Sequence, residues 1–267
     1  MSETKLCKNC NSKLLGLYCS ECGQKKTELL SVKAIVKELT DNVFSFDSRF
    51  FITLKYLMIK PGFLTKEYWA GKRTKYLPPL KMYLVLSVFY FFLQGFMNDG
   101  NQTIFNSSNS EVPSINIDDF PYFPPFFIDN INQGLIVMDK RQLNGQDLLF
   151  DYIPSAMFIL MPFMGLLLLL VYKKKKLFYS YHLITVLHFH CFVFFLNSVE
   201  ELFPIIDAII PLFFFYYAIS MLKVVYQDSW KKTSIKFMML LVTYGMSIVL
   251  TILTIVFGRI FMLGLSA

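Results

Sequence analysis

Residues 79–97, PLKMYLVLSVFYFFLQGFM, form a run of apolar and uncharged side chains that a single lysine interrupts. About 20 such residues in an α-helix match the hydrocarbon core of a bilayer, which is ~30 Å thick. The 267-residue chain is 55% apolar and only 17% charged, and four more blocks of this kind follow, at residues 153–172, 177–196, 202–222 and 237–257. The sequence therefore predicts an all-α polytopic membrane protein with about five transmembrane helices.

The lysine and arginine residues fall mainly on one side of these blocks. Of the 26, 14 precede the first block, four form the run at residues 173–176, and four lie within residues 223–236. The positive-inside rule then places the N-terminus in the cytoplasm and the loop at residues 98–152 outside. An odd number of spans leaves the C-terminus outside as well. The net charge of +7 is thus first of all a signal of topology.

Two C-x-x-C pairs stand near the N-terminus, formed by Cys7, Cys10, Cys19 and Cys22. This spacing is typical of a tetrahedral structural zinc site. Asn11 and Gly23 follow the pairs and tolerate the left-handed backbone that turns amides toward the sulfurs. We expect one structural zinc, with iron as the alternative metal and two disulfides as the alternative pairing, which a reducing cytoplasm disfavours. Four protein ligands leave no place for a substrate, so the site is expected to organise a fold.

Three amphipathic helices are expected between the cysteines and the first span. Apolar residues recur every three or four positions over residues 28–46 and again over residues 48–59, where Phe51 and Leu57 are expected to face inward. A shorter helix is expected over residues 63–70, ended by Gly71. The helices either lie in the headgroup layer or pack with the cysteine clip. The predicted organisation is a zinc-ribbon clip at 1–27, cytoplasmic helices at 28–78 and a transmembrane bundle at 79–267.

The segment GKRTKYLPP, residues 71–79, is predicted to anchor the chain at the membrane surface. Its lysine, arginine and tyrosine side chains suit the headgroup layer, and the two prolines stiffen the entry to the first span. The alternative is a contact with the phosphate of a lipid or substrate. The candidate contact residues are Lys72, Arg73, Lys75 and Tyr76.

The clip ending YCSECGQ, followed by a basic-Pro-Gly step, a tyrosine, Gly-Lys-Arg, a second tyrosine and a proline, resembles the bacterial membrane-protein family classed as domain of unknown function 3667. The corresponding positions are Lys60, Pro61, Gly62, Tyr68, Gly71, Lys72, Arg73, Tyr76 and Pro79. The family usually has arginine where this chain has Lys60. The resemblance covers roughly the first 95 residues. It implies a bacterial inner-membrane protein with a zinc ribbon ahead of transmembrane helices, and no established activity.

Polar residues inside the predicted spans form a second candidate site. His188 is expected near the middle of the third span, His190 beside it, and Asp207 in the fourth, with Pro211 near the middle of that span. Ionisable groups at this depth usually face a cavity or a partner. They would line a path for a proton, metal or haem, or else the histidines are neutral and hydrogen-bond between helices.

Two classes of function remain open. In the first, the chain is a membrane-anchored interaction or complex-subunit protein whose clip presents a cytoplasmic docking surface. In the second, it is a small transporter or membrane enzyme built on the intramembrane polar residues. Nucleotide loops and catalytic triads are absent from the sequence, which favours the first. The expected partners are the lipid bilayer and other membrane or cytoplasmic proteins rather than nucleic acid. Self-association is expected through a small-residue stripe in the fifth span, at Gly245, Ser247 and Thr251.

Overall fold

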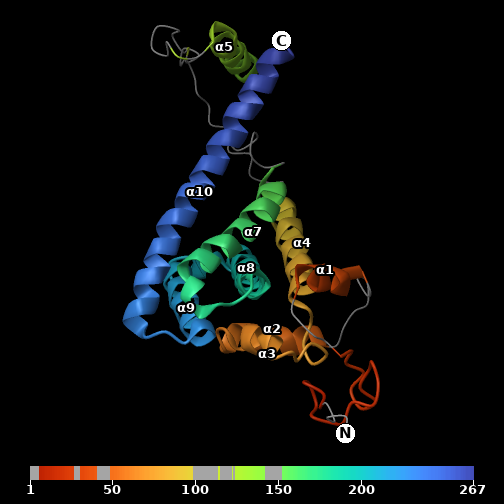
Figure 1. Ribbon diagram of the computed structural model, residues 1–267. Coiled ribbons are helices and arrows are strands. Elements are labelled where there is room, and N and C mark those ends of the chain that lie inside the picture. The colour runs from red at the N-terminus through yellow and green to blue at the C-terminus, as the bar shows by residue number, and fades with distance from the viewer. Residues whose placement is uncertain are drawn as a thin grey trace. The chain divides into compact units, whose positions relative to one another are not determined.

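The computed structural model describes residues 6–26, 31–40, 49–98, 114, 122, 124–141 and 152–267 (Figure 1). Over these residues the regular structure is helical apart from isolated bridges in the cysteine clip, which confirms the all-α class. The chain divides into two compact units. Unit 1 comprises Met1–Gln102 and Met161–Leu240, and unit 2 comprises Thr103–Leu160 and Leu241–Ala267.

The helices follow the expected order along the chain. They are α1 (Val32–Thr40), α2 (Arg49–Ile59), α3 (Phe63–Trp69), α4 (Pro79–Asn98), α5 (Pro125–Lys140), α7 (Ile153–Val171), α8 (Tyr179–Leu202), α9 (Ile210–Tyr226) and α10 (Trp230–Leu265), with short 3₁₀ helices η2 (Lys173–Lys175) and η3 (Pro204–Ile206). The bounds of α2 and α3 agree closely with the expected ones. Gly71 follows α3 with φ +90°, the left-handed conformation that commonly ends a helix and that glycine adopts readily.

Five apolar helices correspond to the five predicted blocks. Of these, α4, α8 and α10 are long and apolar enough to cross a membrane, whereas α7 and α9 are shorter apolar helices. At 1.5 Å per residue the 36 residues of α10 extend about 54 Å, well beyond the hydrocarbon core. α9 begins later than predicted because residues 204–206 form η3. Pro211 therefore lies in the first turn of α9 and not near the middle of a span. Backbone N–H groups in the first turn have no acceptor within the helix, so a proline there costs no hydrogen bond.

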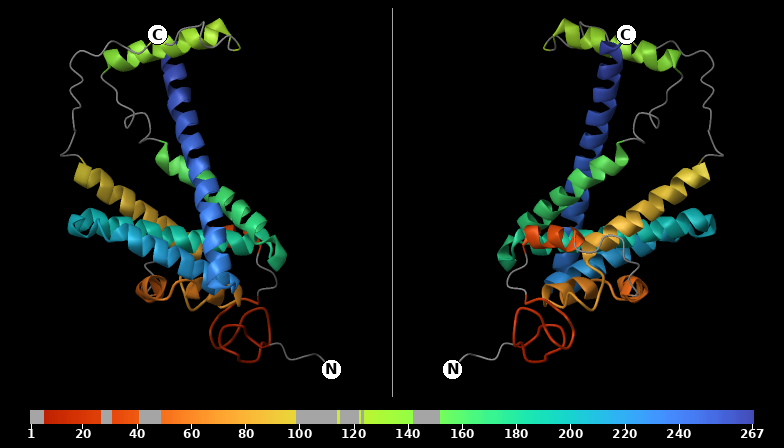
Figure 2. Two further views of the ribbon diagram at one scale, coloured as in Figure 1. Left: turned by 90° about the vertical axis from the view of Figure 1, so that its left-hand side faces the viewer. Right: turned by 90° about the vertical axis from the view of Figure 1, so that its right-hand side faces the viewer.

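The core of unit 1 is built around α8, the most buried of the candidate spans. α4 and α8 lie side by side along much of their length (Figure 2). Aromatic rings dominate this contact: the ring of Tyr83 meets that of Phe194 at 5.5 Å between centroids. On another side of α8, Phe192 stacks on Tyr217 of α9 at 3.5 Å between centroids. Such rings bury large apolar areas, which fixes how the helices of unit 1 pack.

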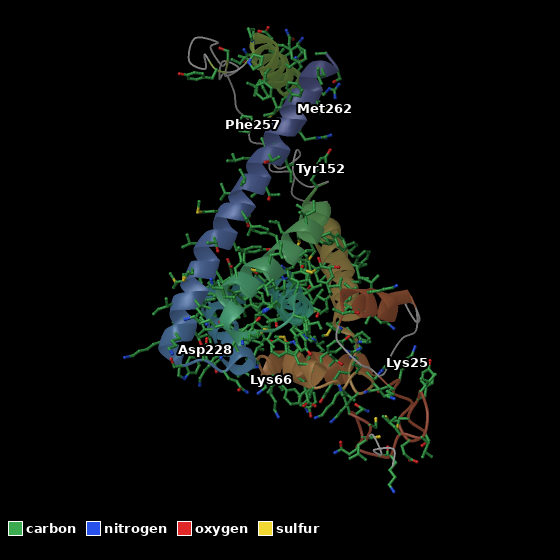
Figure 3. All side chains as sticks on the ribbon, in the orientation of Figure 1. Lys25, Lys66, Tyr152, Asp228, Phe257 and Met262 are labelled. Atoms are coloured by element: carbon green, nitrogen blue, oxygen red, sulfur yellow. The ribbon has the colours of Figure 1, made fainter. Side chains whose placement is uncertain are left out.

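α2 and α3 pack against α8 and α9, with side chains filling the space between them (Figure 3). The hydroxyl of Tyr217 donates a hydrogen bond to the carbonyl of Leu57, 2.7 Å away. Between the helices, Gly62 has φ +76°, and a Cβ there would lie 3.0 Å from the carbonyl oxygen of Met221. The Pro-Gly step is therefore a close contact with α9 as well as a helix break.

One expected orientation is wrong. Leu57 is buried, as predicted, but Phe51 is 68% exposed and shares the outer face of α2 with Ile59. The inward face of α2 instead carries Thr53, which accepts a hydrogen bond from the N–H of Leu77 at 2.9 Å. Periodicity alone did not reveal which side of the helix α8 and α9 would cover.

Unit 2 pairs α5 with the C-terminal part of α10. Ile131 and Ile260 are buried against each other, and Phe127 stacks on Phe261 at 5.2 Å between ring centroids. The two backbones come close at paired glycines. A Cβ on Gly134 would collide with the carbonyl of Ile260, and one on Gly264 with a carbonyl of α5. The segment between the first two predicted spans thus contains a helix, α5, which packs on α10.

Candidate metal centre

The four N-terminal cysteines lie on two turns with the same hydrogen bonds. In the first, the N–H of Cys7 donates to Ser12 O at 2.8 Å and that of Asn11 to Cys7 O at 2.9 Å. In the second, Cys19 N–H donates to Gln24 O and Gly23 N–H to Cys19 O, both at 2.9 Å. Asn11 and Gly23 have φ +62° and +69°, the left-handed conformation predicted for these positions. Each C-x-x-C pair therefore forms a knuckle that turns both sulfurs to one side.

The four sulfurs converge on one point. The Sγ atoms of Cys7 and Cys22 are 3.6 Å apart, those of Cys10 and Cys19 are 3.5 Å apart, and all four lie within 4.8 Å of one another. A zinc–sulfur bond of about 2.3 Å implies a sulfur–sulfur separation of about 3.8 Å along the edge of a tetrahedron. The cysteines are free thiols. Their geometry thus fits a metal ion held by four sulfurs.

A serine adds a polar contact to this cluster that the cysteine spacing did not predict. Ser12 Oγ lies 2.7 Å from the sulfur of Cys10 and 3.2 Å from that of Cys19. The hydrogen bond from Ser12, followed by those from backbone amides of the second knuckle, lowers the pKa of the Cys19 thiol to about 6. Since the thiolate is the form that binds metal, this environment favours coordination.

One residue joins the clip to the loop that precedes the first span. Gln24 is buried, and its Nε2 donates to Gly71 O at 2.8 Å. Its Oε1 accepts from Arg73 N–H at 3.0 Å, from Thr74 N–H at 3.4 Å and from the Thr74 hydroxyl at 2.9 Å. Because the backbone carbonyl of Gln24 closes the second knuckle, this residue belongs to the metal centre and also holds the loop.

Residues 71–78, called here the juxtamembrane loop, are held from a second side by α2. Arg49 Nη1 donates to Thr74 O at 2.7 Å, and Thr53 accepts from Leu77 N–H. The side chain of Lys8, in the first knuckle, lies against Gly71, where a Cβ would come within 2.7 Å of its Cδ. The Gly-Lys-Arg motif therefore marks the place where the cysteine clip meets the helices.

The basic residues of this loop are occupied by contacts within the chain. Lys72 Nζ pairs with both carboxylate oxygens of Glu67, at 2.8 and 2.9 Å. The guanidinium of Arg73 lies 5.3 Å from the ring centroid of Tyr68, and the Lys75 ammonium lies 5.5 Å from that of Tyr76. Tyr76 is buried. These contacts anchor the loop, and the expected contact with an external phosphate stays a prediction.

The structure does not bring the polar residues of the predicted spans together in one cluster. Nδ1 of His188 is 3.1 Å from the hydroxyl of Thr65 in α3, so this histidine meets the α2–α3 segment. His190 donates from Nδ1 to Val186 O of its own helix at 2.9 Å. Asp207 lies in the turn after η3. A polar path through these residues stays a prediction.

Sequence reasoning found the cysteines and the two left-handed residues but missed Ser12 and Gln24. A polar residue directly after each knuckle was the only local signal for them. The partners of Gln24 could not be inferred, because they lie 47 to 50 positions away along the chain.

A known protein family matches the part of the chain around the juxtamembrane loop. Residues 47–91 match the model of a family described as protein of unknown function (DUF3667). This confirms the resemblance over a segment that contains α2, α3, the juxtamembrane loop and the start of α4. The cysteine clip lies outside the matched residues. No curated protein and no solved structure matches the chain.

Proposed function

We propose that the chain is a membrane-anchored interaction protein in which a structural zinc clip presents a docking surface on the cytoplasmic side. The observation that carries this proposal is the attachment of the clip by Gln24 to the juxtamembrane loop. A clip fixed in this way holds a constant position next to the membrane. It differs from a module on a flexible tether, which samples a large volume.

Zinc is the metal that the donor set favours. Four sulfur ligands complete a tetrahedral coordination sphere, which is the arrangement of structural rather than catalytic zinc. About 20 residues cannot bury a hydrophobic core of useful size, so metal binding supplies most of the folding free energy of the clip. The metal therefore keeps the clip folded, and with it the surface that the clip presents.

The clip exposes apolar and basic side chains. Leu15 is 91% exposed, and Leu17 and Tyr18 are also largely exposed. Lysines at positions 13, 25 and 26 of the clip are exposed as well. Contiguous exposed apolar residues within a polar rim are typical of a protein contact. A partner that fits would offer an apolar patch bordered by acidic residues.

We further propose five spans in a bacterial inner membrane, with the N-terminus in the cytoplasm and the C-terminus outside. The lysine-rich turn at residues 173–176 and the lysines of residues 223–236 then share one side with the clip. The 17 residues of α9 extend about 26 Å, a small mismatch that local thinning of the bilayer accommodates. Reporter fusions at the C-terminus test this topology, and a cytoplasmic C-terminus would refute it.

The docking surface is tested by placing a photo-crosslinking amino acid at Leu15 in the full-length chain and irradiating intact cells. We expect an adduct of defined mass with another protein, and its loss when Cys19 and Cys22 are replaced by serine. The same amino acid at Tyr122, which is 96% exposed and predicted to lie outside, is the matched control and should give a different pattern. An unchanged Leu15 adduct in the double-serine variant, or crosslinks to lipid alone, would refute the proposal.

A further inference from the structure

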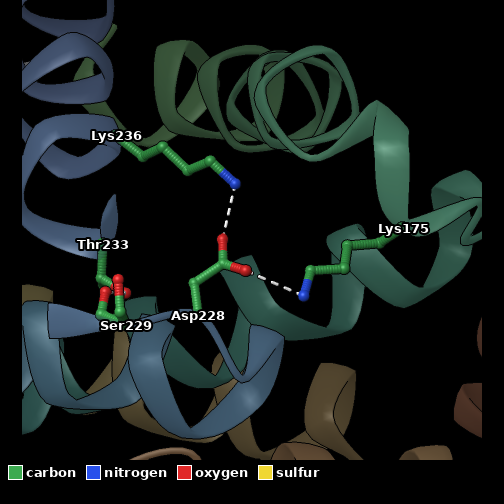
Figure 4. A network of polar contacts seen from close by, with 5 residues as sticks. All are labelled: Lys175, Asp228, Ser229, Thr233 and Lys236. Atoms are coloured by element: carbon green, nitrogen blue, oxygen red, sulfur yellow. Dashed lines mark hydrogen bonds and ion pairs between the residues drawn. The ribbon is translucent and has the colours of Figure 1, made fainter. Parts of the chain in front are cut away.

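Two lysine-bearing turns of unit 1 are tied together by a single carboxylate. Asp228, in the turn between α9 and α10, lies 2.8 Å from Lys175 Nζ in η2 and 2.6 Å from Lys236 Nζ in α10 (Figure 4). Burial by itself would raise the pKa of the Asp228 carboxyl, but the hydrogen bonds and the positive charges of these two lysines together outweigh it and lower the pKa. The carboxylate is therefore charged and holds the η2 turn against the start of α10.

The surface that results carries a large excess of positive charge. Residues 173–176 and 223–236 contain eight lysines and one acid, Asp228, whose charge is shared by Lys175 and Lys236. The ammonium of Lys236 also lies 4.0 Å from the ring centroid of Tyr172. Besides Lys175, which pairs with Asp228, five lysines of these segments are exposed: Lys173, Lys174, Lys176, Lys231 and Lys232. We call these five residues the lysine patch.

The lysine patch lies at the ends of two helices that are candidates to cross the membrane. Residues 173–176 lead into α8, and Lys231 and Lys232 lie in the first turn of α10; both helices are long and apolar enough to cross a bilayer. Trp230 is half exposed beside the patch, and the Lys223 ammonium lies 4.1 Å from its ring centroid. Tryptophan and lysine at the end of a membrane-crossing helix are characteristic of the headgroup layer.

We propose that the lysine patch binds the phosphate groups of anionic phospholipids in the leaflet that it faces. Lysine carries a strongly hydrated point charge and suits phosphate without requiring a fixed geometry. Asp228 acts as a positioning residue, because it brings the charges of two separate turns onto one surface. The patch is separate from the metal centre, so this proposal does not depend on the function of the clip.

The test uses the full chain in nanodiscs and the fluorescence of Trp230. The chain contains two tryptophans, so the difference between the wild type and Trp230→Phe isolates the Trp230 signal. A minority of the lipid is brominated on its acyl chains, as phosphatidylglycerol in one sample and as phosphatidylcholine in the other. Each lysine near an anionic surface favours the anionic lipid by up to about fivefold. We expect the brominated phosphatidylglycerol to quench Trp230 at least about threefold more.

Two variants with equal loss of charge separate the patch from a general effect. Replacing Lys173, Lys174 and Lys176 by glutamine should abolish most of the preference for brominated phosphatidylglycerol. The control replaces three exposed lysines of α2, its C-terminal boundary and α3, namely Lys55, Lys60 and Lys66, and should retain the preference. Equal quenching by the two lipids in the wild type, or an equal loss in both variants, would overturn the proposal.

Added inorganic phosphate distinguishes a lipid headgroup from a free anion. We expect phosphate to weaken the preference only as much as sodium chloride of the same ionic strength, through screening. A loss at low phosphate concentration that sodium chloride does not reproduce would identify a free-phosphate site and refute membrane docking.

Discussion

Replacing Gln24 by alanine should detach the metal clip from the juxtamembrane loop without removing the metal. The substitution deletes every side-chain hydrogen bond between Gln24 and residues 71–74. It leaves intact the backbone bond from Cys19 N–H to Gln24 O, which closes the second knuckle. The loop keeps its contacts with α2 through Arg49 and Thr53.

The size of the effect follows from the geometry. Three of the bonds are 2.8–3.0 Å long, and the fourth, at 3.4 Å, is too long to contribute much. At about 1 kcal/mol for each good bond, the docked state should lose about 3 kcal/mol, which shifts the docking equilibrium by about two orders of magnitude.

Amide hydrogen exchange measured by mass spectrometry reads this change directly. The N–H groups of Arg73 and Thr74 donate to Gln24 in the wild type, so in Gln24→Ala they should exchange up to about a hundredfold faster. Lys25→Ala, at an exposed neighbouring position, is the control and should leave the exchange of residues 71–77 unchanged. Wild-type exchange rates in a Gln24→Ala protein that still binds metal would show that the side chain does not hold the loop.

Three further substitutions test the packing and the ion pairs. Gly62→Ala places a Cβ against the backbone of α9 at a position with strained φ, so it should reduce the free energy of unfolding by about 1–3 kcal/mol and lower the thermal unfolding temperature in detergent. Gly245→Ala is the control and should not lower this temperature, because the space around Gly245 is open. Gly264→Ala should separate α5 from α10 and expose α5 to proteolysis, and an uncleaved variant would contradict the close contact. The fold lowers the pKa of the Asp228 carboxyl from its usual value of 3.8. The stability that the charged carboxylate contributes is therefore complete above pH 3.8 and is lost as the pH falls through the lower pKa of the folded chain. The difference in unfolding temperature between wild type and Asp228→Asn should therefore be constant near neutral pH and shrink below about pH 4, and a difference independent of pH would refute a charged Asp228.

The features that sequence predicted well depend on nearby residues. Apolar runs of about 20 residues indicated helices, and Gly71 indicated the end of α3. The cysteine spacing likewise predicted a cluster of four sulfurs, because each knuckle is formed by fewer than ten consecutive residues.

Apart from the contacts of Ser12, the features that sequence missed depend on distant partners. The face that α2 turns inward is decided by α8 and α9, so periodicity could not place Phe51 correctly. The hydrogen bond between Thr65 and His188 joins residues 123 positions apart. Gln24 looked like an ordinary polar residue at the end of a knuckle, and only the folded chain shows it bound to the juxtamembrane loop.

A structural zinc ion held by the four N-terminal cysteines is tested by metal analysis combined with zinc K-edge X-ray absorption of the purified full-length chain. We expect about one zinc per chain with four sulfur neighbours at about 2.3 Å, and loss of the metal when Cys10 and Cys22 are replaced by serine. Disulfides in place of metal, nitrogen or oxygen neighbours around the zinc, or zinc retained by the double variant would contradict it.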